Sequence, residues 1–216
     1  MKLIAIETST DICSISYIND GICKNTIEEI IPRQHAEKLP LFYEELVNES
    51  GLILSELDAI AVSIGPGSFT GLRIGLSYAK GLAGSHKKPI VPVPTLQSLL
   101  HGYGDDYQKV AVILLSHGNK YFVQQFDCTD GKFTSDKIKV HELESVTDFE
   151  NLETDRTIIH YRCDKLFDNS SIANQIIIIN PSAKLIGELG HKNYAKWVNK
   201  KPFKLVPDYV SPFKVG

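Results

Sequence analysis

The sequence is poor in tryptophan, methionine and cysteine, of which its 216 residues contain one, one and four. The cysteines, at positions 13, 23, 128 and 163, form neither a Cys-x-x-Cys pair nor a zinc-ligand spacing, so we expect reduced thiols and a cytoplasmic protein. No apolar run approaches the roughly 20 residues that a membrane-spanning helix needs. The first residues, Met-Lys-Leu-Ile-Ala-Ile-Glu, are too short an apolar run for a secretory leader. We therefore expect no membrane partner.

An excess of either charge is also missing. Lysine and arginine number 23 against 26 aspartates and glutamates, which gives a formal net charge of −3. A composition of 43% apolar and 23% charged residues is typical of a globular protein and excludes a disordered tail or a collagen-like fibre. A chain of this charge has no overall attraction to nucleic acid, although a local basic patch remains open.

The hydrophobic pattern of the first half predicts a defined order of strands and helices. We expect strands at 2–7, 12–18, 22–27, 59–64 and 90–93, and helices at 34–50, at 70–83 and from Thr95 onward. The order β-β-β-α-β-α-β-α is that of the ribonuclease H-like unit, which is repeated in actin-like ATPases. The sequence therefore predicts a two-lobed α/β protein with the actin-like ATPase fold.

The second half is less regular. We expect strands at 110–115, 121–127, 132–141, 157–161 and 176–179, and helices at 145–152 and from Asn180-Pro181 to about 189. Glycines and aspartates cluster near residues 100–108. We therefore predict a first lobe at 1–103 and a second, degenerate lobe at 104–216.

A glycine-rich stretch runs from Ser63 to Gly75, off a predicted strand and into a predicted helix. Free backbone N–H groups at such a helix start suit an anion. With the acid and hydroxyls after the first strand, the candidate phosphate or anion loop comprises Glu7, Thr8, Ser9, Thr10, Gly67 and Ser68. The stretch lacks the Lys-Ser/Thr pair of a Walker A loop. Because the hairpin Leu115-Ser116-His117-Gly118-Asn119 offers no carboxylate as a second phosphate loop, this is half a nucleotide site, or a well-capped connector.

Small residues recur every four positions in the second predicted helix, at Gly71, Gly75, Ala79 and Ala83. Each glycine costs up to about 1 kcal/mol of helix stability relative to alanine, so a close neighbour should compensate. That neighbour is either the protein's own sheet or first helix, or a second chain that docks on this row.

Three motifs, Ile4–Thr10, Gln34–Leu39 and Gly65–Gly75, resemble the TsaB (YeaZ) family, which belongs to the bacterial machinery for threonylcarbamoyl modification of tRNA at adenosine 37. The resemblance covers about residues 1–100. The hairpin Leu115-Ser116-His117 stands where that family has Asp-Ala-Arg, and Pro207–Ser211 only echoes its C-terminal motif.

The resemblance implies a non-catalytic scaffold that binds and activates the paralogous catalytic subunit TsaD, with the ATPase TsaE joining the pair. TsaD carries a metal-binding His-x-x-x-His on its first helix, and here Leu39 replaces the second histidine after His35. The implied partner-binding residues on the first two helices are His35, Leu39, Phe42, Leu46, Gly71, Leu72, Gly75 and Ala79. We expect no metal and no cofactor of the chain's own. Whether a nucleotide binds at the partner interface stays an open question. We also expect a homodimer when the partner is absent, and tRNA contact only through the complex.

Two enzyme classes stay open beside the scaffold: an actin-fold nucleotide-binding enzyme such as a kinase, and a glycoprotease-like peptidase. A homodimeric nucleotide sensor that uses Glu7, Thr8 and Thr10 is a third alternative, and direct tRNA binding a fourth.

Overall fold

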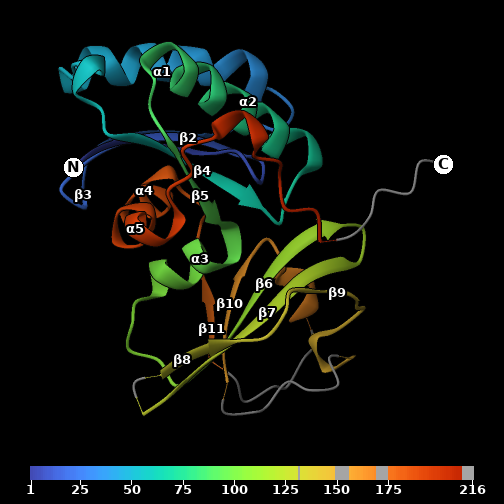
Figure 1. Cartoon of the computed structure of the whole chain (residues 1–216). Coiled ribbons are helices and arrows are strands. Elements are labelled where there is room, and N and C mark those ends of the chain that lie inside the picture. The colour runs from blue at the N-terminus through green and yellow to red at the C-terminus, as the bar shows by residue number, and fades with distance from the viewer. Residues whose placement is uncertain (131, 149–155, 169–174, 211–216) are drawn as a thin grey trace. The chain divides into compact units, whose positions relative to one another are not determined.

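The computed structural model describes residues 1–130, 132–148, 156–168 and 175–210. The chain divides into two compact units, of which unit 1 comprises 1–98 and 181–208, and unit 2 comprises 99–180 and 209–216 (Figure 1). Helix α3 (Thr95–Tyr103) carries the chain across the boundary. Within the described residues, no helix is both long enough and apolar enough to cross a membrane.

Unit 1 is built on a five-stranded sheet in the order β3-β2-β1-β4-β5. The strands are β1 (Lys2–Glu7), β2 (Ile12–Asn19), β3 (Ile22–Ile30), β4 (Ala59–Gly65) and β5 (Ile90–Pro94). The first three pair antiparallel, and β4 and β5 run parallel to β1. The β2–β3 connection uses Asp20 and Gly21 at φ of 51° and 78°, the left-handed pair that a tight hairpin turn requires. This is the ribonuclease H-like order that the sequence predicts.

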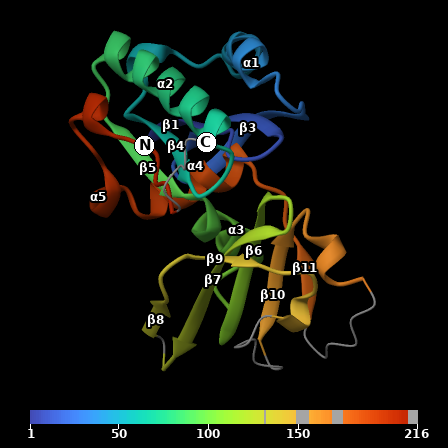
Figure 2. The same ribbon diagram turned by 90° about the vertical axis from the view of Figure 1, so that its right-hand side faces the viewer.

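Helices cover both faces of this sheet (Figures 1 and 2). On one face lie α1 (His35–Ser50) and α2 (Phe69–His86), which bury Leu39, Leu46 and Leu76 against the sheet. On the other face α4 (Ala183–Lys192) buries Ile186 among β-strand side chains. The short α5 (Tyr194–Trp197) and the 3-10 turns Leu54–Glu56 and Pro202–Lys204 complete the unit.

Unit 2 contains a six-stranded sheet in which β11-β10-β6-β7-β8 are neighbours and β9 also pairs with β7. Its strands are β6 (Lys109–His117), β7 (Lys120–Thr129), β8 (Lys132–Ser135), β9 (Lys139–Glu142), β10 (Thr157–Tyr161) and β11 (Ile176–Ile178). Arg156 is buried and ties the sheet together, because its guanidinium donates to the carbonyls of Val110 and Phe126 and pairs with Asp127.

The predicted boundary between residues 103 and 104 needs a correction at the C-terminal end. The prediction gave all of 104–216 to the second lobe, whereas 181–208 belongs to unit 1. The reason is burial: without α4, one face of the first sheet would expose its apolar side chains. Gly187 shows how close this packing is, since a Cβ there would lie 2.3 Å from Ile18 Cγ1.

Three predicted elements also differ in detail. Helix α2 runs past Gly84 to His86, because Lys87 adopts the left-handed capping conformation instead. The strand expected at 132–141 is two strands, β8 and β9, separated at Asp136, whose carboxylate accepts from the Gln125 amide at 2.8 Å. The helix expected at 145–152 is a 3-10 turn at Val146–Asp148, and its remainder lies outside the described residues.

Candidate functional site

The turn between β1 and β2 packs directly against the start of α2. The Ser68 amide donates to the Ser9 carbonyl at 2.6 Å, and the Thr8 hydroxyl donates to the Gly71 carbonyl at 2.9 Å. Ser68 caps the helix, since its hydroxyl accepts from the Gly71 amide at 3.2 Å. Several polar groups of the predicted anion loop are thus bonded to one another within unit 1.

The small-residue row of α2 exists because of this contact. A Cβ at Gly71 would lie 2.0 Å from the Thr8 carbonyl oxygen, and one at Gly75 would lie 2.2 Å from Thr8 Oγ1. Neither approach leaves room for a methyl group. Of the two interpretations of the row, packing against the protein's own sheet and turn is therefore the one that the structure supports.

Glu7 lies at the end of β1 with its carboxylate completely buried. One carboxylate oxygen accepts from the Ser9 amide, and the other has no hydrogen-bond partner. Burial raises the pKa of Glu7 to about 7, and the hydrogen bond from the Ser9 amide opposes this shift only in part. The Glu7 carboxyl group therefore changes its protonation state near neutral pH in the folded protein.

The remaining loop residues take local roles. Thr10 is half-buried, and its hydroxyl accepts from the Ile12 amide at 3.2 Å. Gly67 lies against Ser9, with its Cβ position 2.3 Å from the Ser9 carbonyl oxygen. Thr8 and Ser9 are buried, so the loop presents mainly Ser68 to solvent.

The eight residues predicted to bind a partner lie in the interior of unit 1, and their binding role stays a prediction. All of them are buried within unit 1, so they do not form an exposed face. His35 is 5% exposed, and its Nε2 lies 3.1 Å from the Ile12 carbonyl oxygen, which makes it a fixed residue of the interior. The helical periodicity that identified these residues is the signature of the core-facing side of α1 and α2. Those buried residues are His35, Leu39, Phe42, Leu46, Gly71, Leu72, Gly75 and Ala79.

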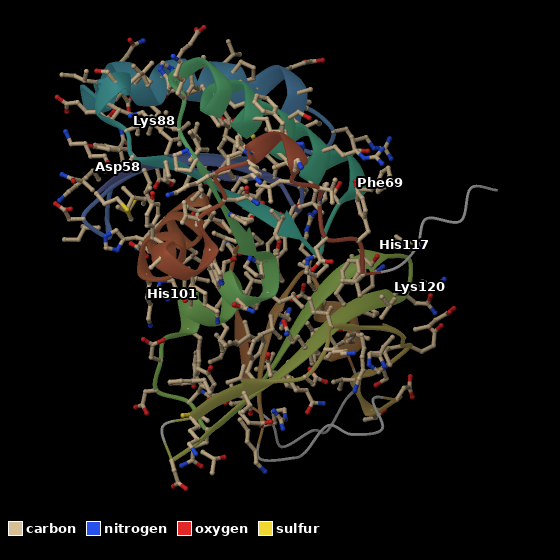
Figure 3. All side chains as sticks on the ribbon, in the orientation of Figure 1. Asp58, Phe69, Lys88, His101, His117 and Lys120 are labelled. Carbon is tan, nitrogen blue, oxygen red and sulfur yellow. The ribbon has the colours of Figure 1, made fainter. Side chains whose placement is uncertain are left out.

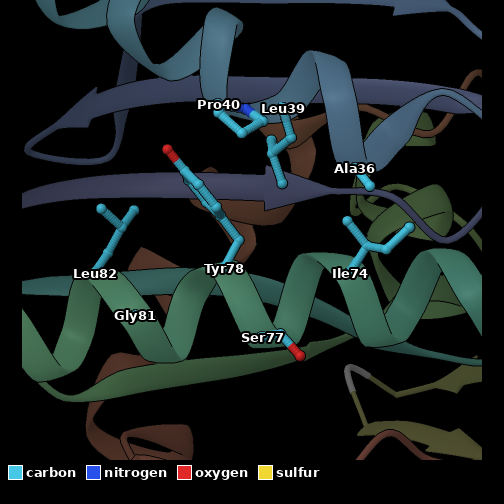
Figure 4. A pocket seen from close by; sticks show the side chains of 8 residues that line it. All are labelled: Ala36, Leu39, Pro40, Ile74, Ser77, Tyr78, Gly81 and Leu82. Carbon is cyan, nitrogen blue, oxygen red and sulfur yellow. The ribbon is translucent and has the colours of Figure 1, made fainter.

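The same two helices enclose a groove of about 430 Å³ on their outer side (Figure 4). Ile74, Tyr78 and Leu82 point from α2 toward α1. The lining residues are Ala36, Leu39, Pro40, Ile74, Ser77, Tyr78, Gly81 and Leu82. Tyr78 also meets Tyr43 edge-on, at 5.8 Å between ring centroids, and burial raises the pKa of Tyr78, so its phenol stays protonated.

Of these lining residues, the sequence interpretation had singled out only Leu39. A signal for the others was present, since Ile74, Tyr78 and Leu82 recur at i, i+4 and i+8 beside the small-residue row. The row of glycines and alanines drew attention to the core-facing side of the helix instead.

Comparison with known proteins identifies the family. The model of the family described as "TsaD: tRNA N6-adenosine threonylcarbamoyltransferase" matches residues 23–185. Over 102 residues the chain is 38% identical to the tRNA threonylcarbamoyladenosine biosynthesis protein TsaB of Escherichia coli, which covers 47% of this chain and 44% of that protein. The chain belongs to the TsaD-related TsaB (YeaZ) family.

A second relative, the TsaB-named protein of Haemophilus influenzae, is 35% identical over 127 residues, which cover 57% of this chain and 53% of that protein. The chain thus spans about half the length of the curated relatives it matches. The fold agrees over a longer range: a Pseudomonas aeruginosa structure described as similar to peptidase YEAZ superposes with a TM-score of 0.81 at 24% identity. That superposition covers 97% of this TsaB-family chain and 99% of the other.

The fold also extends to more distant proteins. The Clostridium difficile activator of 2-hydroxyisocaproyl-CoA dehydratase, solved with bound ADPNP, superposes with a TM-score of 0.50 at 7% identity over 91% of this chain and 96% of that one. With the strand order of unit 1, this confirms the predicted two-lobed actin-like α/β fold.

Proposed function

We propose that this chain acts in the biosynthesis of threonylcarbamoyladenosine in tRNA, as a non-catalytic subunit that binds a TsaD-type transferase and holds it active. The observation that carries the proposal is the apolar groove between α1 and α2. The groove is lined by Ile74, Tyr78 and Leu82, and Leu41 on the same helix pair is 54% exposed. An unfilled apolar surface of this kind marks an interaction site. The names of the relatives supply the kind of partner.

The first helix supports a role without metal chemistry of the chain's own. His35 is buried and held by the Ile12 carbonyl, and the position one helical turn later is the core residue Leu39. Among the described residues, no three His, Cys, Asp or Glu side chains gather in a group that could hold a metal ion. The chain would then contribute surface and orientation to the reaction, and the partner would contribute the reacting groups.

The wider assembly follows from the same proposal. A TsaE-type ATPase joins the pair, the tRNA is the substrate of the complex, and any nucleotide lies at the interface with the partner. In the absence of TsaD, the groove is covered by a second copy of this chain, because burying an exposed apolar surface lowers the free energy of the system.

The groove can be tested by filling it at Gly81, a lining position where an added Cβ meets nothing within 4 Å. Gly81→Trp should leave unit 1 folded and weaken co-purification with the same organism's TsaD at least tenfold. Lys184→Trp is the matched control, since Lys184 is exposed on α4, across the sheet from the groove. Circular dichroism of both variants verifies the fold.

Equal binding by the two variants would place the interface elsewhere and overturn the proposal. Failure of the unaltered chain to bind TsaD would do the same. Titration of the isolated chain with magnesium-ATP addresses the enzyme alternatives, because tight binding without a partner would favour a nucleotide-binding enzyme over a scaffold.

A further inference from the structure

Positive charge is concentrated in the C-terminal part of unit 1. Residues 181–208 contain six lysines but only Glu188 and Asp208 as acids, a formal charge of +4. The whole chain carries −3, so the remainder carries −7. The small net charge of the protein is therefore the sum of a positively charged C-terminal segment and a negatively charged remainder.

Pairing brings a second group of lysines to this segment. Asn199 forms an antiparallel bridge with Ile90, with amide-to-carbonyl distances of 2.8 and 3.1 Å. The bridge brings Asn199, which Lys200 and Lys201 follow, to the first residue of β5, which Lys87 and Lys88 precede by two to three positions. We name these four residues, together with Lys204, the lysine surface.

The segment that carries Lys204 is anchored to α2. The 3-10 turn Pro202–Lys204 lies beside that helix in Figures 1 and 2, and the Lys80 ammonium donates to the Leu205 carbonyl at 2.7 Å. A Cβ at Gly84 would lie 3.0 Å from the Phe203 ring, so the ring rests on the last turns of α2. The lysine surface is thus a fixed part of unit 1.

The charges of the lysine surface are not neutralised within the protein. Lys87, Lys200, Lys201 and Lys204 are exposed, and among the described residues no carboxylate forms an ion pair with any of them. The Lys88 ammonium donates only to the Ser55 carbonyl, at 3.1 Å.

The acids on this flank have partners of their own. Figure 3 shows Lys88 and Asp58 on the same flank of unit 1. Glu56 pairs with the Lys2 ammonium, and Asp58 accepts from the Lys2 amide at 2.7 Å. The unpaired cations are therefore available to a polyanion from outside.

An exposed aromatic ring lies among these cations. Phe203 stands between Lys201 and Lys204 in sequence and is 70% exposed, although burial of such a ring would be favourable. Nucleic-acid sites for unpaired strands combine backbone-tracking lysines with aromatic rings on which bases stack. An anionic membrane surface would favour a long amphipathic helix, whereas α5 has four residues.

We propose that the lysine surface with Phe203 is an RNA-binding site, at which the lysines contact phosphates and Phe203 stacks on an unpaired base. The inference rests on the proposed function, since the relatives are named for the biosynthesis of a modified nucleoside in tRNA. It adds a direct contact between this chain and RNA, whereas the sequence interpretation favoured contact through the complex and kept direct binding as an alternative.

The test is binding of the full chain to a fluorescently labelled tRNA transcript, measured by anisotropy over a range of salt concentrations. The triple variant Lys200→Gln, Lys201→Gln, Lys204→Gln should weaken binding at least tenfold. It should also make the salt dependence of log K shallower by about 2 to 3, because each of the three lost phosphate contacts removes roughly 0.7 to 0.9 from the slope. Phe203→Ala should weaken binding about fivefold or more and leave the salt slope unchanged.

The matched control is Lys132→Gln, Lys137→Gln, Lys165→Gln, which removes the same charge from three exposed lysines of unit 2. This control should bind RNA within about twofold of the unaltered chain. Equal losses in the two triple variants, or no RNA binding at low salt, would overturn the proposal. Lysine-dependent binding to phosphatidylserine vesicles without RNA binding would overturn it in favour of a membrane surface.

Co-purification of the lysine variant with TsaD separates this inference from the proposed function. Lys200, Lys201 and Lys204 are not among the residues that line the groove, so the variant should retain TsaD while losing RNA. Loss of RNA binding with TsaD binding intact supports the RNA site. Loss of both activities would overturn the inference that RNA and TsaD bind to separate surfaces of this chain.

Discussion

At the residue scale, glycines of one helix have opposite environments. Gly75 faces Thr8 at a distance that excludes a methyl group, whereas Gly81 faces open space in the groove. Both cost helix stability in isolation, so only the tertiary neighbours distinguish them.

This contrast predicts that the same substitution, glycine to alanine, changes the free energy of unfolding in opposite directions at the two positions. Gly75→Ala should lower the free energy of unfolding by about 1–3 kcal/mol through the clash with Thr8 Oγ1. Gly81→Ala should raise it by up to about 1 kcal/mol, because helix propensity acts there without opposition. Urea unfolding of the two variants measures both, and destabilisation by Gly81→Ala would contradict the open groove.

Glu7 gives a second residue-scale prediction, in the dependence of stability on pH. Its folded pKa of about 7 lies above the ordinary value of 4.5, so its contribution to stability is complete below 4.5 and is lost as pH rises through 7. The expected loss is on the order of 3 kcal/mol.

Glu7→Gln is a neutral isostere and should remove this slope. The quantity to measure is the difference in unfolding free energy between Glu7→Gln and the unaltered chain, from about pH 5 to about pH 8, in which other titrating groups cancel. A difference that stays constant across this range would show that Glu7 does not titrate there.

At the scale of elements, α4 completes unit 1 from a distant part of the chain. Ala183, Ile186 and Leu189 form its buried side against the first sheet, and Ser14 Oγ accepts from the Ala183 amide at 3.0 Å. The sheet has one face covered by α1 and α2, and depends on α4 for the other.

We therefore expect Ile186→Ala, at a fully buried position, to destabilise unit 1 by about 2–5 kcal/mol. Lys184→Ala on the exposed side of the same helix should change stability by less than about 0.5 kcal/mol. Denaturant unfolding distinguishes the two, and similar small effects would mean that α4 docks only loosely.

At the scale of the whole molecule, the proposed groove predicts self-association of the isolated chain. Sedimentation across micromolar concentrations should show a monomer–dimer equilibrium, since the α1–α2 surface is covered when two copies meet. Gly81→Trp should shift this equilibrium toward monomer, whereas Lys184→Trp should not. A monomer at all concentrations for the unaltered chain would contradict the dimer.

Much of the architecture could be predicted from the sequence. The strands of unit 1 and their order followed from the hydrophobic pattern of the first half and from the glycine-rich entry to α2. The site could not be predicted equally well. Periodicity identifies the apolar side of a helix, and in α1 and α2 that side is the core, so the predicted partner-binding residues were interior ones.

The sequence alone determined the order of the local elements and the family, because these depend on patterns between near neighbours and on motifs such as Gly65–Gly75. Tertiary structure decided which glycines are crowded, which side of α1 and α2 remains open, and that residues 181–208 return to unit 1. It also brought Asn199, which Lys200 and Lys201 follow, to Ile90 at the start of β5. The crowding of Gly71 and the return of residues 181–208 depend on contacts between residues more than 60 positions apart, which no local pattern encodes.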